Sequence, residues 1–165
     1  MKEILLIIFL VTLFYMSIAN RMRGYIQVLS IQGVLMFLVA FFQLHEVSAF
    51  NLFWILLETI IFKSVAVPYF LSTIIKHNKI TRESEPFLPH FVSLIITTAI
   101  VVGTIILASM IKDEHLDKIF FVAAVSAIFF GLYFISSRRK LLSHVMGYVV
   151  IENGVFILSL AVGNE

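Results

Sequence analysis

Residues 91–111 read FVSLIITTAIVVGTIILASMI, and none of these side chains carries a charge. A helix needs about 20 predominantly apolar residues to cross the hydrocarbon core of a bilayer. This segment meets that length without interruption, and it lacks the period-two alternation of a membrane β-strand. The segment therefore predicts a transmembrane helix.

The composition extends this expectation to the whole chain. Of 165 residues, 61% are hydrophobic and 13% are charged, and the mean hydropathy is +1.05. A soluble domain carries about 25% charged residues, so a soluble enzyme is excluded. The 12 Lys and Arg residues and the net charge of +2 do not suit a nucleic-acid-binding face. The absence of cysteine excludes disulfides, cysteine metal sites and thiol catalysis.

Six apolar stretches reach or approach the spanning length, which predicts an all-α polytopic helix bundle forming a single domain over residues 1–165. They cover residues 4–19, 25–44, 49–75, 91–111, 119–137 and 145–163. The first stretch resembles a signal peptide. Arg21 and Arg23 follow it directly, so we expect it to be retained as a span.

The basic residues between the stretches predict an orientation in the cell (inner) membrane. Loops one, three and five hold eight of them, and the opposite side holds only Lys2, Lys112 and Lys118. The eight are Arg21, Arg23, Lys76, Lys79, Arg82, Arg138, Arg139 and Lys140. Because basic loops stay in the cytoplasm, both termini are expected outside, in the periplasm of a bacterium. The run Arg138–Lys140 is expected to contact anionic lipid headgroups.

A weak internal repeat relates residues 1–75 and 116–165. Each part begins with a short helix and a basic turn, followed by a helix with a similar string. The strings are QGVLMFL from Gln32 and NGVFILS from Asn153. Repeats are common in transporter folds, although apolar helices also resemble one another by chance.

Three ionisable residues lie well inside the predicted spans: Glu58, Lys63 and Glu152. A charge at the bilayer centre costs about 2.5–3.5 kcal/mol on insertion scales, and such residues usually face a partner or a cavity. On a regular helix Glu58 and Lys63 lie ~140° apart, so each is expected to find a different partner. Pro68 cannot donate to the carbonyl of Ser64, which predicts a helix break with a bare carbonyl.

Glu152 is followed by Asn153 and preceded by Tyr148 one turn earlier. Lys63 is the base available to it inside the membrane. Removal from water favours the neutral forms of both groups, so the two could exchange protons. The alternative is that Glu58, Lys63 and Glu152 only lock helices or subunits together. Four further polar residues are expected to make interhelical hydrogen bonds. They are Gln27, Gln32, Gln43 and Asn51.

Two motifs resemble those of a known family. The stretch KSVAVP from Lys63 to Pro68 resembles the Lys-x-x-x-x-Pro of the third helix in the hydrogenase-4 component E family. The run SSRRKLLSHVMGYVVIENG, residues 136–154, is similar to that family's basic turn followed by Gly-Tyr-x-x-x-Glu-Asn-Gly. The later helices also resemble the K subunit of complex I and the C subunit of multisubunit cation/proton antiporters.

The resemblance implies that Glu152 matches the first of the K subunit's buried glutamates, which form part of a proton path. It implies a place in an energy-converting hydrogenase or formate hydrogenlyase beside antiporter-like subunits, whose metal chemistry lies in other chains. Members of that family usually continue into a further helix with another acidic residue, so the resemblance implies either a seventh helix after Glu165 or a shortened form of the family. Glu58 has no counterpart in the family pattern.

The sequence therefore predicts a subunit that relays protons through Glu152 and Lys63, with Tyr148 near the entry and no cofactor, metal or redox site of its own. One rival is a purely structural subunit that bridges larger ones. A second rival is an independent small carrier, which the lack of a substrate-binding cluster disfavours. The five histidines lie at or near loops without metal-type clustering.

Overall fold

The computed structural model describes residues 1–43, 57, 59–78, 88–112 and 116–162. Its helices are α1 (Lys2–Ile18), α2 (Met22–Gln43), the π-helix η1 (Thr59–Ala66), α4 (Val67–His77), α5 (His90–Met110), α6 (Lys118–Ser137) and α7 (Leu141–Val162). Because η1 runs directly into α4, the two form one rod, and the described residues form six helices. The all-α prediction is confirmed.

Four helices, α2, α5, α6 and α7, are long and apolar enough to cross a membrane. The length and composition of these four helices indicate a multi-pass membrane protein. Helix α1 has 17 residues, which corresponds to about 26 Å against a hydrocarbon core of about 30 Å. The third stretch, residues 49–75, lies partly outside the described residues. Membrane crossing by α1 and by η1–α4 stays a prediction.

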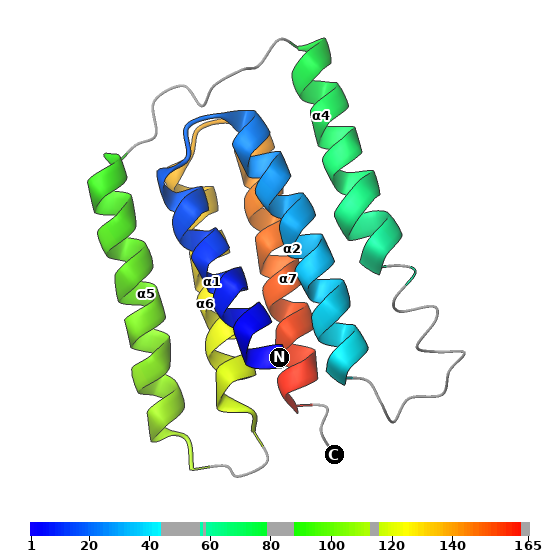
Figure 1. The fold of residues 1–165 in the computed structure, drawn as a ribbon. Coiled ribbons are helices and arrows are strands. Elements are labelled where there is room, and N and C mark those ends of the chain that lie inside the picture. The colour runs from blue at the N-terminus through cyan, green and yellow to red at the C-terminus, as the bar shows by residue number, and fades with distance from the viewer. Residues whose placement is uncertain (44–56, 58, 79–87, 113–115, 163–165) are drawn as a thin grey trace.

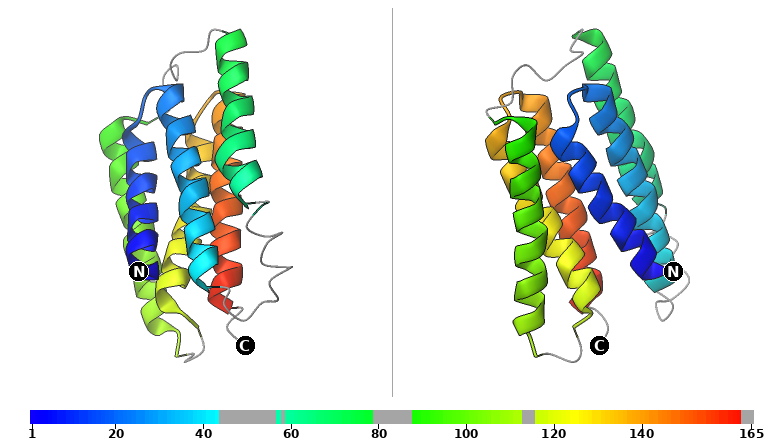
Figure 2. Two further views of the ribbon diagram at one scale, coloured as in Figure 1. Left: turned by 45° about the vertical axis from the view of Figure 1, so that its right-hand side comes forward. Right: turned by 60° about the vertical axis from the view of Figure 1, so that its left-hand side comes forward.

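Helices α1, α2, α6 and α7 form the centre of the bundle, and α5 and η1–α4 lie on opposite flanks (Figures 1 and 2). Helix α5 packs on α1 and α6, whereas η1–α4 packs on α2. The α1–α2 turn, the α6–α7 turn and the last turn of α4 lie at one end (Figure 1). The α1–α2 and α6–α7 basic turns and Lys76 therefore lie at the same end, whereas Lys79 and Arg82 lie outside the described residues.

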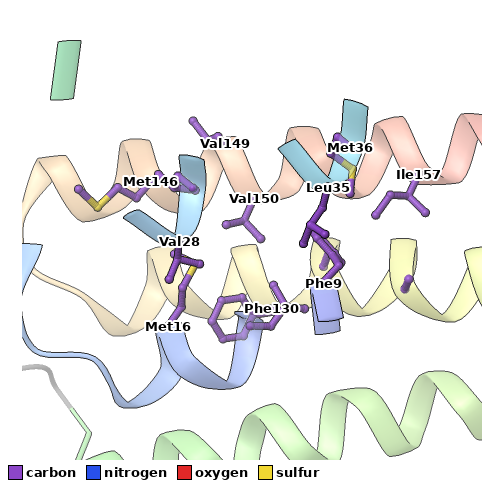
Figure 3. Close-up of a cluster of buried hydrophobic side chains, with 14 of the residues drawn as sticks. Phe9, Met16, Val28, Leu35, Met36, Phe130, Met146, Val149, Val150 and Ile157 are labelled. Carbon is purple, nitrogen blue, oxygen red and sulfur yellow. The ribbon is translucent and has the colours of Figure 1, made fainter. Parts of the chain in front are cut away.

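Apolar side chains from the four central helices form most of the core (Figure 3), and Leu71 and Ile75 of α4 join it. Phe9, Met36, Phe130 and Met146 are fully buried. By contrast, most of α5 is exposed, including Ile95, and forms an apolar outer surface suited to lipid.

Small residues bring α6 and α7 into close contact. A Cβ atom on Gly147 would lie 2.7 Å from Cγ1 of Ile135 and 3.1 Å from the carbonyl oxygen of Gly131. Such close backbone approach is typical of helix pairs in membranes. A Cβ atom on Gly154 would likewise lie 2.8 Å from the carbonyl oxygen of Ala124, so α7 packs closely on α6 next to Glu152 and Asn153.

Candidate functional site

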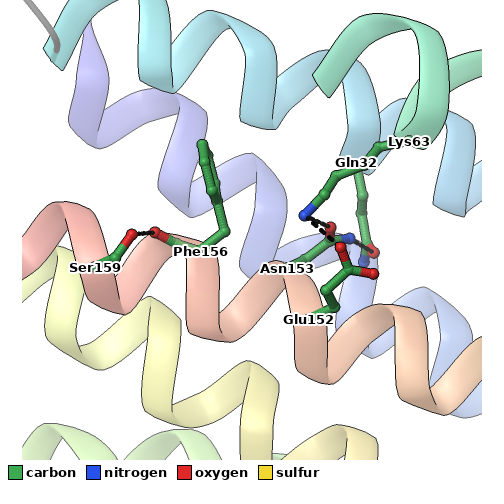
Figure 4. A network of polar contacts seen from close by, with 6 residues as sticks. All are labelled: Gln32, Lys63, Glu152, Asn153, Phe156 and Ser159. Atoms are coloured by element: carbon green, nitrogen blue, oxygen red, sulfur yellow. Dashed lines mark hydrogen bonds and ion pairs between the residues drawn. The ribbon is translucent and has the colours of Figure 1, made fainter. Parts of the chain in front are cut away.

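An ion pair joins η1 and α7 (Figure 4). Lys63 Nζ of η1 lies 3.3 Å from Glu152 Oε1 of α7. The Lys63 side chain is 15% exposed, whereas that of Glu152 is 51% exposed. The pair therefore lies at the edge of the bundle, with the ammonium covered and the carboxylate partly open to the outside.

A chain of hydrogen bonds continues from Lys63 into the core. Lys63 Nζ also donates to Asn153 Oδ1 at 3.4 Å, and Asn153 Nδ2 donates to Gln32 Oε1 at 3.2 Å. Gln32 Nε2 then donates to Thr12 Oγ1 at 2.8 Å, and the Thr12 hydroxyl donates to the carbonyl of Phe9. Gln32 and Asn153 are buried, so the chain satisfies polar groups that lipid would leave unpaired.

The close approach of η1 to α2 depends on Gly33. A Cβ atom there would lie 2.7 Å from the backbone nitrogen of Ser64 and 2.8 Å from the carbonyl carbon of Lys63. These distances are shorter than any ordinary carbon contact. Gly33 thus allows the backbone that carries Lys63 to lie directly against α2, beside Gln32.

The predicted helix break at Pro68 takes a different form. The carbonyl of Ser64 is not bare, because Ser30 Oγ of α2 donates to it at 2.9 Å. Residues 59–66 form a π-helix, and α-helical geometry resumes at Val67 with Pro68 in its first turn. The carbonyl that was expected to be bare is therefore bound by a hydroxyl group of α2. Wider π-turns frequently occur at functional sites.

Phe156 covers Lys63 on one side. The Nζ atom lies 5.0 Å from the centroid of the Phe156 ring, one helical turn after Glu152. An aromatic face attracts a cation most strongly where water is excluded. The ammonium group therefore has three favourable contacts, with a carboxylate, an amide oxygen and a ring.

The other predicted residues have different positions. Tyr148 of α7 is 64% exposed, one turn before Glu152, and no hydrogen bond among the described residues joins it to the network. Glu58 and Asn51 lie outside the described residues. Gln32 makes the predicted interhelical hydrogen bond, to Thr12 of α1. Gln27 is exposed near the α1–α2 turn, and Gln43 is the last residue of α2.

The basic run at the α6–α7 turn is not wholly a lipid contact. Arg138 is 2% exposed, and its Nη2 donates to the carbonyl of Ser17 at 3.4 Å. Its guanidinium lies 5.0 Å from the ring centroid of Phe134 and 5.8 Å from that of Tyr25. The expectation of headgroup contact is wrong for Arg138, because aromatic rings and a helix end enclose it.

The two strings of the predicted repeat meet at this site. Gln32 and Asn153 occupy the first position of their strings, and they hydrogen-bond to each other. Gly33 and Gly154 occupy the second position, and each allows close approach of a neighbouring helix. The repeat itself stays a prediction.

Searches against family models, curated proteins and solved structures each find no match. Among the described residues, no group of three His, Asp or Glu side chains is placed to hold a metal ion. The fold and site define a class, a multi-pass membrane protein with an ion pair and a buried amide chain between its helices.

Proposed function

We propose that this chain is a membrane subunit that relays protons within a larger energy-converting complex. The contact between Lys63 and Glu152, 3.3 Å apart on two different helices, carries the proposal. Intramembrane acids and bases are costly and typically mark ion or proton pathways. A carboxylate and an amine also exchange protons between them without any further cofactor.

The two charged groups are the proton carriers in this proposal, and the amides position them. Asn and Gln side chains have no proton that titrates in the ordinary range, so the chain through Gln32 does not itself conduct. It fixes Lys63 and Asn153 against α2. Because half of the Glu152 side chain is exposed, its second oxygen is open to water or to a neighbouring subunit.

The resemblance to the hydrogenase-4 component E family supports the proposal that the complex is an energy-converting one. It favours an energy-converting hydrogenase or related respiratory assembly, with antiporter-like subunits as neighbours and the redox chemistry in other chains. The exposure of half of the Glu152 side chain, despite its ion pair with Lys63, supports a place within an assembly, because a carboxylate that faces lipid is unfavourable. Sodium is an alternative coupled ion.

A structural role is the rival, and one observation favours it. The hydrogen-bond chain connects α1, α2, η1 and α7, so the site also acts as a tether among four segments. A purely structural subunit would use Glu152 for assembly only. The proposal and its rival differ in what a neutral replacement of Glu152 does to an assembled complex.

The first experiment is a gentle detergent extraction of the tagged chain from its native membrane, with mass spectrometry of the proteins that accompany it. Stoichiometric recovery of antiporter-like and hydrogenase-type subunits is expected. Recovery of this chain alone, monodisperse and able to conduct protons in liposomes, would establish an independent carrier and contradict the subunit proposal.

The second experiment replaces Glu152 by Gln in the complex. We expect Glu152→Gln to leave assembly intact and to reduce coupled proton transfer at least about tenfold, because the relay loses one of its two titratable groups. The matched control is Ser159→Ala, on the same exposed face of α7, whose hydroxyl bonds only within its own turn to the carbonyl of Phe156. Full transfer in an assembled Glu152→Gln complex would refute the relay, and loss of assembly would support the structural role.

A further inference from the structure

A surface groove lies at the α1–α2 turn, at the end of the bundle that carries the basic turns. Its volume is about 520 Å³, and it is lined by residues from both helices. Five of them carry polar groups: Tyr15, Asn20, Arg21, Arg23 and Gln27. We propose that this groove binds the phosphate of an anionic phospholipid headgroup.

The lining has the chemistry of a phosphate site. Arg21 and Arg23 are exposed, and each presents a planar fork of N–H donors that matches phosphate oxygens. The hydroxyl of Tyr15 and the side-chain amides of Asn20 and Gln27 supply further donors. No carboxylate lines the groove, and none in the described part of the chain pairs with either guanidinium.

A third guanidinium adds positive charge beneath the same turn. The buried Arg138 donates to the carbonyl of Ser17 near the end of α1, while its Nε and Nη1 atoms have no acceptor among the described residues. It lies over the ring of Tyr25, whose hydroxyl donates to the carbonyl of Ala19 in the groove wall. The turn therefore carries three cationic groups and attracts an anion.

The surface next to the groove favours a lipid over a free phosphate ion. The exposed face of α1 carries Ile4, Ile8, Val11 and Ile18 in line with Tyr15, at helical spacings of three and four. Residues so spaced form one continuous stripe. A phospholipid whose acyl chain lies along this stripe would place its headgroup in the groove, at the basic end of the bundle. Tyr15 then occupies the interface, where tyrosine is enriched.

The test measures lipid binding to the purified chain in detergent by native mass spectrometry. Phosphatidylglycerol should bind in preference to phosphatidylcholine. Arg21→Gln and Arg23→Gln should each lower phosphatidylglycerol binding about fivefold, the effect of one basic side chain at an anionic surface. Both side chains are exposed, so both variants should melt at the wild-type temperature.

The matched control is Lys76→Gln, which removes one exposed charge at the same end of the bundle but outside the groove. It should bind phosphatidylglycerol like the wild type. Equal binding of the two lipids, or an equal loss in Lys76→Gln, would overturn the proposal. Displacement of the lipid by inorganic phosphate at matched concentration would identify a soluble-anion site instead. Because lipid binding is measured without proton transfer, its outcome is separate from that of the relay proposal.

Discussion

Lys63 determines the direction of every hydrogen bond in the chain that starts from it. A lysine ammonium only donates, so Asn153 must turn its oxygen toward Lys63 and its nitrogen toward Gln32. Gln32 must then present its oxygen to Asn153 and its nitrogen to Thr12, whose hydroxyl is left to donate to a backbone carbonyl. One charged side chain thereby orients two amides and a hydroxyl across three neighbouring helices.

A double-mutant cycle tests the central contact. We expect Lys63→Met and Glu152→Gln to be non-additive, with a coupling energy above about 0.5 kcal/mol, because the two side chains touch. The measurement is SDS-driven unfolding in mixed micelles, followed by circular dichroism. The cycle of Lys63→Met with Ser159→Ala is the control and should be additive. Additivity in both cycles would mean that the ion pair does not form in the folded protein.

At the scale of the element, the rod of η1 and α4 depends on the surface of α2. Ser30 supplies the donor for the Ser64 carbonyl, and Gly33 removes the side chain that would hold the rod away. The two residues lie almost one turn apart on the same face of α2. A single strip of α2 therefore supports both the π-helix and the position of Lys63.

Gly33→Ala should separate η1 from α2. The added methyl group would lie within 3 Å of backbone atoms, which do not move aside as a flexible side chain would. We expect a loss of about 1–3 kcal/mol in unfolding free energy, as for an overpacked core. The measurement is the same SDS titration. Gly103→Ala is the control, since nothing lies within 4 Å of its added Cβ, and equal stability of both variants would contradict the close approach.

At the scale of the whole molecule, the six helices alternate in direction, so the basic turns and the start of α1 lie at opposite ends. The basic end carries Arg21, Arg23, Lys76 and the run 138–140, against Lys2, Lys112 and Lys118 at the other. By the positive-inside rule, this asymmetry predicts that the α1–α2 turn lies in the cytoplasm.

Cysteine labelling checks this orientation directly, because the natural chain has no cysteine. Glu3→Cys and Asn20→Cys both create an exposed thiol without removing a basic residue. A membrane-impermeant maleimide should label the Glu3→Cys variant in intact cells and the Asn20→Cys variant only after permeabilisation. The reverse pattern would place both termini in the cytoplasm.

The sequence predicted the six helices because apolar length is a property of each segment alone. It also singled out Lys63, Glu152 and Asn153, because charged and amide groups inside an apolar stretch require partners. It did not predict Thr12, Ser30 or Phe156, whose residue types are ordinary in membrane helices. Their roles depend on which helices are neighbours. The π-helical turns and the burial of Arg138 were missed for the same reason.

The separation of Lys63 from its partners along the chain has a consequence for biosynthesis. Lys63 and Asn153 are 90 positions apart, and a ribosome adds about 5–20 residues per second. Lys63 is therefore made about 5–18 s before Asn153. During that interval Lys63 lacks both of its polar partners on α7, Glu152 and Asn153. Lys63 therefore gains its carboxylate and amide partners only once α7 has been made.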